Sequence, residues 1–407
     1  MQKIKDSKII IIGGGGIGCG IAYSLCQEGE TDVLLLEKND ALAVETTSQG
    51  AGLVGQLRNN FHRAALAKWS VRIFSELEKS AIKKPGWMQV GSIRVALTEE
   101  QANKFEKLKS IAKDAEINVD WITNQEAKKK WPLFDFSSAK GVLWCDSDGY
   151  LSPPKLTESY ASEAMMLGAK FETGILVEEI ISSNGKITGV KTNKGTICCD
   201  ILINAAGAHA WHIAKMAGLD LPIFPVRHEY FISIEMENIH PLLPTMRIPE
   251  ASLYLRASNN SLLLGGWEPD SVYTDPKNFK NGEKPPVIKD DLNVMKWFKD
   301  QLKIIYPKNK IIQNKKVYKG WPTFVPDGRF IVGPTKKLQG YIMAGGCNAH
   351  GISGSAGIGK HVVDSIFSKE KSEYLDSLSP DRFLSIDNSN REKEIKESQK
   401  IYENYYN

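Results

Sequence analysis

Three glycines near the start of the chain have the spacing of a phosphate-binding turn. Gly13, Gly15 and Gly18 follow the apolar run 8–12 and fill a G-x-G-x-x-G pattern. Gly13 permits the tight turn, Gly15 lets a pyrophosphate approach the backbone, and Gly18 lets the next helix pack closely. A helix over 16–28 would direct its free N–H groups and positive dipole end at that phosphate. The pattern predicts a dinucleotide-binding unit.

A carboxylate follows the turn at the distance where a ribose-binding acid belongs. The second apolar run, 33–36, ends at Glu37, about twenty residues beyond the glycines. A carboxylate here accepts both ribose hydroxyls and repels a 2′-phosphate, which disfavours NADP. The alternative is an ordinary βαβ unit with an exposed glutamate, but strand, loop, helix and acid occur in the expected order. The motif alone leaves NAD and FAD open.

Segments along nearly the whole chain resemble the D-amino acid oxidase superfamily of flavoproteins. The resemblance is carried by 13–23 (GGGGIGCGIAY), 36–38, 46–57 (TTSQGAGLVGQL), 148–156 (DGYLSPPKL), 186–208, 323–333 (TFVPDGRFIVG) and 344–359 (AGGCNAHGISGSAGIG). It implies FAD as the cofactor and an α/β fold, with a Rossmann-like FAD-binding domain on a central parallel sheet. A second domain with an antiparallel sheet is expected to hold the substrate.

Within that superfamily the chain looks most like the flavin half of sarcosine and dimethylglycine dehydrogenases. The matching segments are 51–58, 225–230, 264–269 and 345–353. Those enzymes remove N-methyl groups from small amino acids by hydride transfer to flavin. Two alternatives stay open because other branches share the scaffold. One is an oxidase deaminating a D-amino acid, glycine, proline or an opine, and the other is the flavin-binding beta subunit of a heteromeric amine dehydrogenase. The expected partners are a small amino acid or methylated amine, an unidentified electron acceptor and, in the last case, another subunit.

The resemblance also implies a set of residues that contact FAD. In the C-terminal segment, Gly351, Gly354 and Gly357 would let backbone approach a planar ring, and Ser353 would cap a helix running to about 367. The alternative is a glycine-rich helix packed tightly on a neighbour. The predicted cofactor residues are Gly13, Gly15, Gly16, Ile17, Gly18, Glu37, Lys38, Thr46, Thr47, Ser48, Gln49, Ala51, Gly52, Leu53, Val177, Ala206, Gly207, Gly320, Gly346, Gly351, Ile352 and Ser353.

Two departures from the relatives predict that FAD is bound noncovalently. Gln49 stands where the dehydrogenases carry the histidine that bonds to flavin. Gly320 stands where monomeric sarcosine oxidases carry the linking cysteine. Neither residue is a nucleophile that could form such a bond.

Two further departures concern the electron acceptor. Leu263 and Ser353 fall where monomeric sarcosine oxidases carry lysines beside the flavin. A lysine there stabilises the superoxide formed by the first electron, so its loss favours a dehydrogenase over an oxidase. Lys319 is the nearby lysine that could substitute.

Four residues are candidates for substrate chemistry. His228 lies in a segment resembling the one that holds an active-site histidine, and Tyr254 and Arg256, two apart, share one face of a strand. Arginine offers a bidentate fork for a carboxylate, and a histidine or tyrosine could keep the substrate amine neutral. The alternative is a packed histidine and a surface arginine. His350, beside the C-terminal glycines, is a further candidate, ahead of His209 and His212.

The motifs divide the chain into two discontinuous parts. The FAD-binding domain is expected from 1–85, 145–222 and 318–407, and the substrate domain from 86–144 and 223–317. The tail after 387, rich in Lys, Glu and Asn, predicts an exposed helix or a frayed end. We expect no counterpart of the folate-binding half of the multidomain dehydrogenases.

Composition argues against other classes of protein. The 52 basic and 48 acidic residues nearly balance, which disfavours a nucleic-acid binder. The six cysteines form no Cys-x-x-Cys pair or metal-ligand spacing, so no metal site is expected. The initial apolar run is too short to span a bilayer or to serve as a signal peptide. We expect a cytoplasmic protein.

Overall fold

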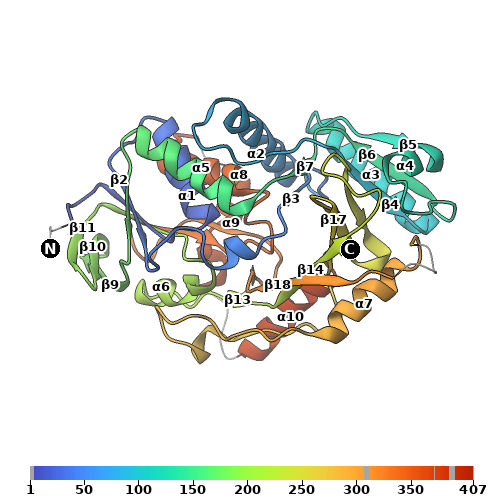
Figure 1. Ribbon diagram of the computed structural model, residues 1–407. Coiled ribbons are helices and arrows are strands. Elements are labelled where there is room, and N and C mark those ends of the chain that lie inside the picture. Colours follow the sequence, from blue (N-terminus) through green and yellow to red (C-terminus); the bar gives the residue numbers. More distant parts are fainter. Residues whose placement is uncertain (1–3, 307–310, 371, 385–389, 407) are drawn as a thin grey trace.

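A six-stranded sheet and an eight-stranded sheet lie side by side in the computed structural model (Figure 1), which describes residues 4–306, 311–370, 372–384 and 390–406. The six-stranded sheet is parallel except at one edge, where β20 runs antiparallel to β21. Its strands in spatial order are β20 (Ile331–Pro334), β21 (Tyr341–Gly345), β12 (Ile201–Asn204), β1 (Ile9–Ile12), β2 (Val33–Glu37) and β8 (Lys170–Thr173).

Strand β1 is buried on both faces, as its unbroken run of isoleucines predicts. Ile9 and Ile11 pack in a core with helices, whereas Ile10 and Ile12 pack in the core of the opposite face. The first face is covered by α1 (Gly16–Gln27), α2 (Phe61–Ser80), α5 (Pro153–Met166) and α8 (Ser355–Phe367). The second is covered by α6 (Ala210–Met216) and by a small sheet of β9 (Val177–Ser183), β10 (Lys186–Thr192) and β11 (Gly195–Cys198).

The eight-stranded sheet is antiparallel apart from the parallel pair β15–β4. Its hydrophobic core includes side chains of α4 (Asn124–Lys130) and α7 (Leu292–Leu302), while α3 (Glu99–Asp114) packs beside β4 and β6. In spatial order the strands are β18 (Asn314–Gly320), β14 (His228–Glu235), β17 (Ser261–Gly266), β16 (Leu253–Ser258), β15 (Thr245–Ile248), β4 (Ser92–Ala96), β6 (Gly141–Cys145) and β5 (Asp120–Ile122).

Residues 252–267 form a hairpin. Strands β16 and β17 pair in antiparallel register and turn at Asn259, whose φ of 54° lies in the left-handed region that asparagine tolerates. Both sheets of the predicted fold class are therefore present. Most strands of the second sheet come from the segments assigned to a substrate domain, but the domain boundaries themselves stay a prediction.

Two short strand pairs connect the sheets. Strand β3 (Leu53–Val54) pairs with β7 (Gly149–Tyr150), and β13 (Phe224–Pro225) pairs with β19 (Thr323–Phe324). Helix α9 (Glu373–Leu378) packs near β20. Within the described part of the chain, no helix combines the length and apolar character needed to cross a bilayer.

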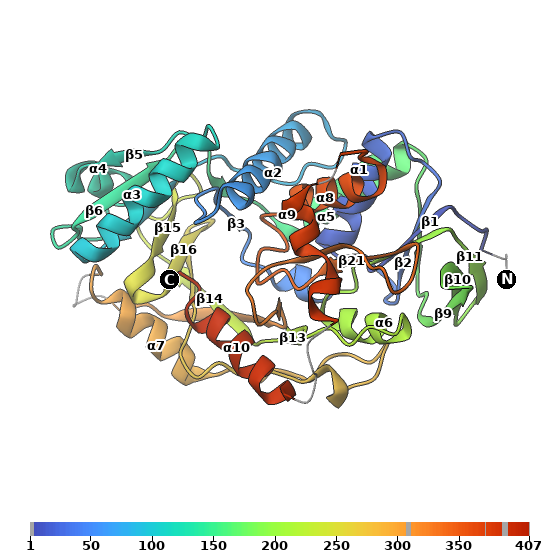
Figure 2. The same ribbon diagram turned by 180° about the vertical axis from the view of Figure 1, so that it is seen from behind.

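The C-terminal tail is packed, which corrects the prediction of an exposed or frayed end. It forms α10 (Arg391–Glu403), which runs along one long edge of the molecule below β13 and β14 (Figure 2). Tyr402 at its end is fully buried. Most of its Lys and Glu residues lie on the outer face of the helix, whereas Glu394, Ile395, Ser398 and Tyr402 are buried. Composition alone did not separate these two faces.

Candidate active site

Two adjoining cavities lie where the carboxyl ends of the parallel strands meet the eight-stranded sheet. The larger has a volume of about 520 Å³ and the smaller about 100 Å³. Six residues line both cavities: Gly15, Thr46, Thr47, Ala205, Gly207 and Ala208. The pair of cavities therefore forms one elongated space that starts at the glycine turn.

The glycine turn is built as its spacing predicts. Gly13 has a φ of +114°, and a Cβ there would lie 2.4 Å from the carbonyl oxygen of Ala205. A Cβ at Gly18 would lie 1.9 Å from the Gly13 oxygen, so only glycine lets α1 approach the strand this closely. Glu37 faces the small cavity, and its Oε2 accepts a 2.7 Å hydrogen bond from the Gly14 N–H. A narrow cradle with a carboxylate at one end fits the adenosine half of FAD.

Most of the predicted cofactor residues line one of the two cavities. The exceptions are Gly18, which serves helix packing, Ser48, which donates to the Glu45 carbonyl, and Gly346. Gly346 has a φ of +60°, and a Cβ there would lie 2.8 Å from Val325. Their positions indicate that these three shape the surrounding backbone rather than touch a bound group.

The two positions used for covalent attachment in relatives lie against each other. A Cβ at Gly320 would lie 2.2 Å from Oε1 of Gln49, and both residues line the large cavity. Cys347 also lines this cavity, which the sequence reasoning missed. Burial raises the pKa of its thiol to about 12, so the group stays protonated and weakly nucleophilic. These surroundings are consistent with a noncovalently held cofactor.

The C-terminal glycine segment is only partly used as predicted. Gly351 and Ser353 line the large cavity, but the N-cap of α8 is Gly354, and no side chain caps this helix. Cβ atoms at Gly354 and Gly357 would lie 3.1 and 2.4 Å from Leu66 side-chain atoms. For these two glycines the close-packing alternative is correct, because α8 lies tightly against α2. Ser353 as a helix cap is wrong.

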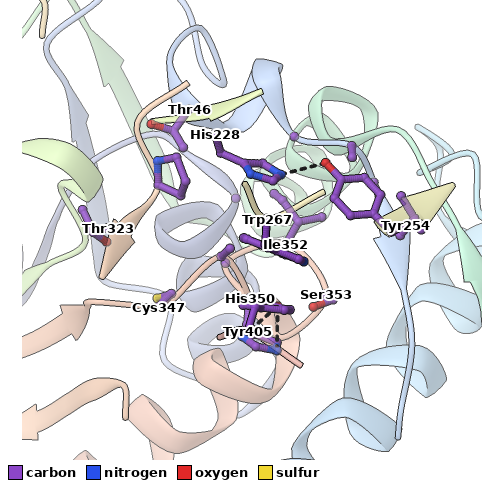
Figure 3. A pocket seen from close by; sticks show the side chains of 18 of the residues that line it. Thr46, His228, Tyr254, Trp267, Thr323, Cys347, His350, Ile352, Ser353 and Tyr405 are labelled. Atoms are coloured by element: carbon purple, nitrogen blue, oxygen red, sulfur yellow. Dashed lines mark hydrogen bonds between the residues drawn. The ribbon is translucent and has the colours of Figure 1, made fainter. Parts of the chain in front are cut away.

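His228 and Tyr254 form a hydrogen-bonded pair in the wall of the large cavity (Figure 3). The Nε2 atom of His228 lies 2.7 Å from the Tyr254 hydroxyl, and its Nδ1 lies 3.1 Å from the Tyr402 hydroxyl. Tyr402 in turn donates to Glu268. Burial lowers the pKa of His228 to about 3, so the ring is neutral.

The partners of His228 select one tautomer. Because Tyr402 donates its proton to Glu268, its oxygen accepts from Nδ1–H of His228. Nε2 is then free to accept from Tyr254. Burial raises the pKa of Glu268, and Arg227, 3.4 Å away, partly offsets this effect by favouring the carboxylate form. Tyr254, His228, Tyr402 and Glu268 thus form a continuous path along which a proton can leave the cavity.

Aromatic rings build the wall beside this pair. Trp267 stacks on His228 with ring centroids 4.5 Å apart and on Tyr405 at 3.7 Å. The Tyr405 hydroxyl lies 3.0 Å from Nε2 of His350, whose Nδ1 lies 2.8 Å from the Asn348 carbonyl oxygen. Burial and the nearby arginines lower the pKa of His350 well below its usual range. His350 is therefore neutral and already paired.

The C-terminal tyrosines are functional-site residues that sequence reasoning missed. Tyr405 and Tyr406 line the large cavity, although they lie more than 130 residues from Trp267. Three tyrosines within 402–406 were the available signal, because a run so aromatic is unusual for an exposed tail.

Arg256 does not line either cavity. Its Nε donates a 2.8 Å hydrogen bond to the Ala51 carbonyl, and its guanidinium lies 4.7 Å from the centre of the Tyr150 ring. This position does not support the predicted role of Arg256 in binding a carboxylate. Arg256 instead holds the 50–52 loop in place. Lys319, considered as a substitute oxygen-site lysine, is also outside the cavity lining and pairs with Asp290.

The charged residues that line the large cavity are all basic. Among the described residues, no aspartate or glutamate lines it. Of the basic residues only Arg58 stands out in sequence, because it ends segment 51–58, which carries the family resemblance; Arg94 and Arg247 carry no local signal. The full set is Arg58, Arg63, Arg94, Lys104, Lys107 and Arg247.

Comparison with known proteins agrees with this site. The family model DAO, described as FAD dependent oxidoreductase, matches residues 8–365. The 4-methylaminobutanoate oxidase (formaldehyde-forming) of Paenarthrobacter nicotinovorans is 29% identical over 364 residues, which cover 89% of this chain and 44% of that protein. Mitochondrial dimethylglycine dehydrogenase of Homo sapiens is 28% identical over 389 residues, covering 93% and 45%. The chain thus spans less than half the length of these relatives.

Solved structures show the same fold. The L-proline dehydrogenase from P. horikoshii superposes with a TM-score of 0.83 at 24% identity, covering 93% of this chain and 98% of that one.

Proposed function

The chain belongs to the DAO family of FAD-dependent oxidoreductases, and on that premise we propose that it oxidises the C–N bond of a small secondary or tertiary amino acid. The favoured reaction is N-demethylation of a substrate of the sarcosine or dimethylglycine type, a reaction named for one relative by its formaldehyde product. FAD, when bound, supplies the hydride acceptor. The residues of the glycine turn and Glu37 would hold its adenosine half, and those lining the large cavity its ring.

The observation that carries the proposal is the neutral Tyr254–His228 pair facing the large cavity. A protonated amine cannot release hydride, because the nitrogen lone pair must be free to form the iminium. In the proposed step, the amine proton passes to the Tyr254 oxygen while Tyr254 passes its own proton to Nε2 of His228. Because the pKa of His228 is about 3, the ring does not keep the extra proton: its Nδ1 proton passes to Tyr402 while Tyr402 passes its own proton to the Glu268 carboxylate.

The positive charge of the cavity also favours a neutral substrate amine. No carboxylate among the described lining residues can pair with a substrate ammonium, whereas the arginines can hold the substrate carboxylate. Positive neighbours lower the pKa of a bound amine. Both effects favour the neutral amine that oxidation requires.

A panel of amines tests this proposal. Purified FAD-loaded protein is mixed anaerobically with N-methyl amino acids and with the matching primary L- and D-amino acids, and the flavin absorbance is followed. We expect bleaching by N-methyl substrates, with formaldehyde released as water hydrolyses the iminium. Bleaching by primary amines with release of ammonia would instead support the deaminating alternative. A protein that no amine reduces until a partner chain is added would support the subunit alternative.

A further inference from the structure

We propose that the large cavity takes amino-acid substrates with two acid groups, and that Arg94 and Arg247 bind the second one. This inference rests on the proposed function, because it names the substrate class of the same site. It predicts an N-substituted amino dicarboxylic acid, rather than a simple N-methyl amino acid with one carboxylate, as the preferred substrate.

The register of the eight-stranded sheet places these side chains in one row. Arg94 on β4 pairs with Arg247 on β15, and Arg247 pairs with Tyr254 on β16. Paired residues on neighbouring strands point to the same face, about 5 Å apart. All three line the large cavity. The two guanidinium groups therefore lie beside the tyrosine at which the proposed reaction removes a proton.

The positive charge of this row is only weakly compensated in the described part of the protein, because Asp148 acts on Arg94 through space but accepts its hydrogen bonds from Ser92 and Gln56. Arg58, Arg63, Arg94 and Arg247 take part in none of the ion pairs found among the described residues. Arg58 and Arg94 both donate to the carbonyl of Leu57. Arg247 is only 8% exposed, and its buried Nη1 has no hydrogen-bond partner.

Such an arrangement is unfavourable without an anion. Burial, together with the neighbouring arginines, lowers the pKa of Arg58 to about 9 and that of Arg94 to about 10. Buried charges in proteins are normally paired, and an unpaired one costs several kcal/mol. A single carboxylate accepts a bidentate fork from one guanidinium. One acid group would leave most of the cluster uncompensated, whereas two acid groups give Arg94 and Arg247 a partner of their own.

Two exposed lysines in the cavity lining also support an anionic ligand. Lys104 and Lys107 of α3 line the cavity together with the arginines. Basic side chains around the mouth of a cleft raise the local concentration of anions and speed their association.

Calorimetry with inert substrate analogues tests the inference. In (methylthio)succinate and thiodiacetate a thioether replaces the amine, so neither can be oxidised by loss of hydride to an iminium, and both carry two carboxylates. The matched compound with one carboxylate is 2-(methylthio)butanoate. We expect the FAD-loaded enzyme to bind at least one diacid about 10- to 100-fold more tightly than the monoacid, as one charge-assisted contact provides. If neither diacid binds more tightly than the monoacid, the inference is wrong.

Substitutions of Arg94 and Arg247 test whether these two residues cause the preference for a diacid over a monoacid. In Arg94→Met/Arg247→Met the advantage of the diacid should fall below threefold, while Arg94→Lys/Arg247→Lys should retain part of it. Arg72→Met is the matched control, because Arg72 is half-exposed, pairs with Glu76 on α2 and does not line the cavity. A diacid preference that survives the double methionine variant would overturn the assignment.

Failure of this inference can be distinguished from failure of the proposed function. Binding of a thioether requires no oxidation, so a diacid preference can be measured even if no amine bleaches the flavin. Conversely, bleaching by monocarboxylic N-methyl amino acids without any diacid preference would leave the proposed function intact and refute only this inference.

Discussion

Replacing Tyr254 by phenylalanine removes one oxygen atom from the site and tests the proposed proton transfer. The lost hydroxyl lies 2.7 Å from Nε2 of His228. Its removal leaves a buried ring nitrogen without a donor, which costs about 1–3 kcal/mol. It also removes the proton acceptor nearest the substrate, and general-base contributions are typically about 100- to 10,000-fold in rate. We therefore expect flavin reduction at saturating substrate to slow by about 100-fold or more.

The assay is anaerobic stopped-flow reduction of the bound flavin, measured across pH with a substrate identified by the amine panel. The rate constant of reduction should fall much more than the substrate affinity, because the arginines that hold the carboxylate are unchanged. His228→Gln should also slow reduction and should alter its pH profile. Raising the pH should partly restore the rate in both variants, since more of the substrate then arrives as the neutral amine.

Tyr318→Phe is the matched control. Tyr318 lies on the same sheet and stacks on Tyr230 with ring centroids 5.0 Å apart, but it does not line the cavity. Its loss should change the reduction rate by less than threefold. A Tyr254→Phe enzyme that keeps its flavin spectrum and reduces within threefold of the original rate would refute the proton path through His228.

Three further predictions follow from other parts of the structure. With Gln49 and Gly320 at the attachment positions, acid precipitation should release FAD into the supernatant; flavin in the pellet would reveal a covalent bond. With Leu263 and Ser353 in place of lysines, reduced flavin should react slowly with oxygen and faster with a dye; stopped-flow reoxidation as fast as turnover, with hydrogen peroxide, would contradict this. Burial holds four histidines neutral, with pKa values below the usual 6.5. The unfolded chain takes up protons below that pH and the folded chain does not, so stability is full above pH 6.5 and falls as the pH drops. Lowering the pH from 7.5 to 5 should therefore reduce the free energy of unfolding by about 2 kcal/mol for each of these histidines. In urea titrations His361→Gln should lessen the fall by that amount, and an unchanged pH dependence would show that His361 is protonated in the fold.

The cofactor end of the site could be predicted because its determinants are local. The turn at Gly13, the helix after it and Glu37 lie within about thirty residues, the length of a βαβ unit. The glycines are required by their immediate surroundings. At Gly18, for example, a Cβ would clash with the Gly13 oxygen. The prediction for Gly357 failed because a distant residue, Leu66 of α2, packs against it.

The substrate end was decided by tertiary structure. Tyr254 and Arg256 share a strand face, as alternation predicts, yet the loop of Ala51 engages Arg256 and leaves Tyr254 in the cavity wall. The partners of Tyr254 in its row, Arg94 and Arg247, come from separate strands whose register is set by the packing of the whole sheet. By itself the sequence determined a dinucleotide-binding turn and a short list of polar candidates, because local spacing encodes them, and its resemblance to a flavoprotein family implied FAD and the type of each sheet. Which of those candidates face one another was decided only when distant strands and the C-terminal tyrosines closed around one cavity, because side-chain direction depends on long-range packing.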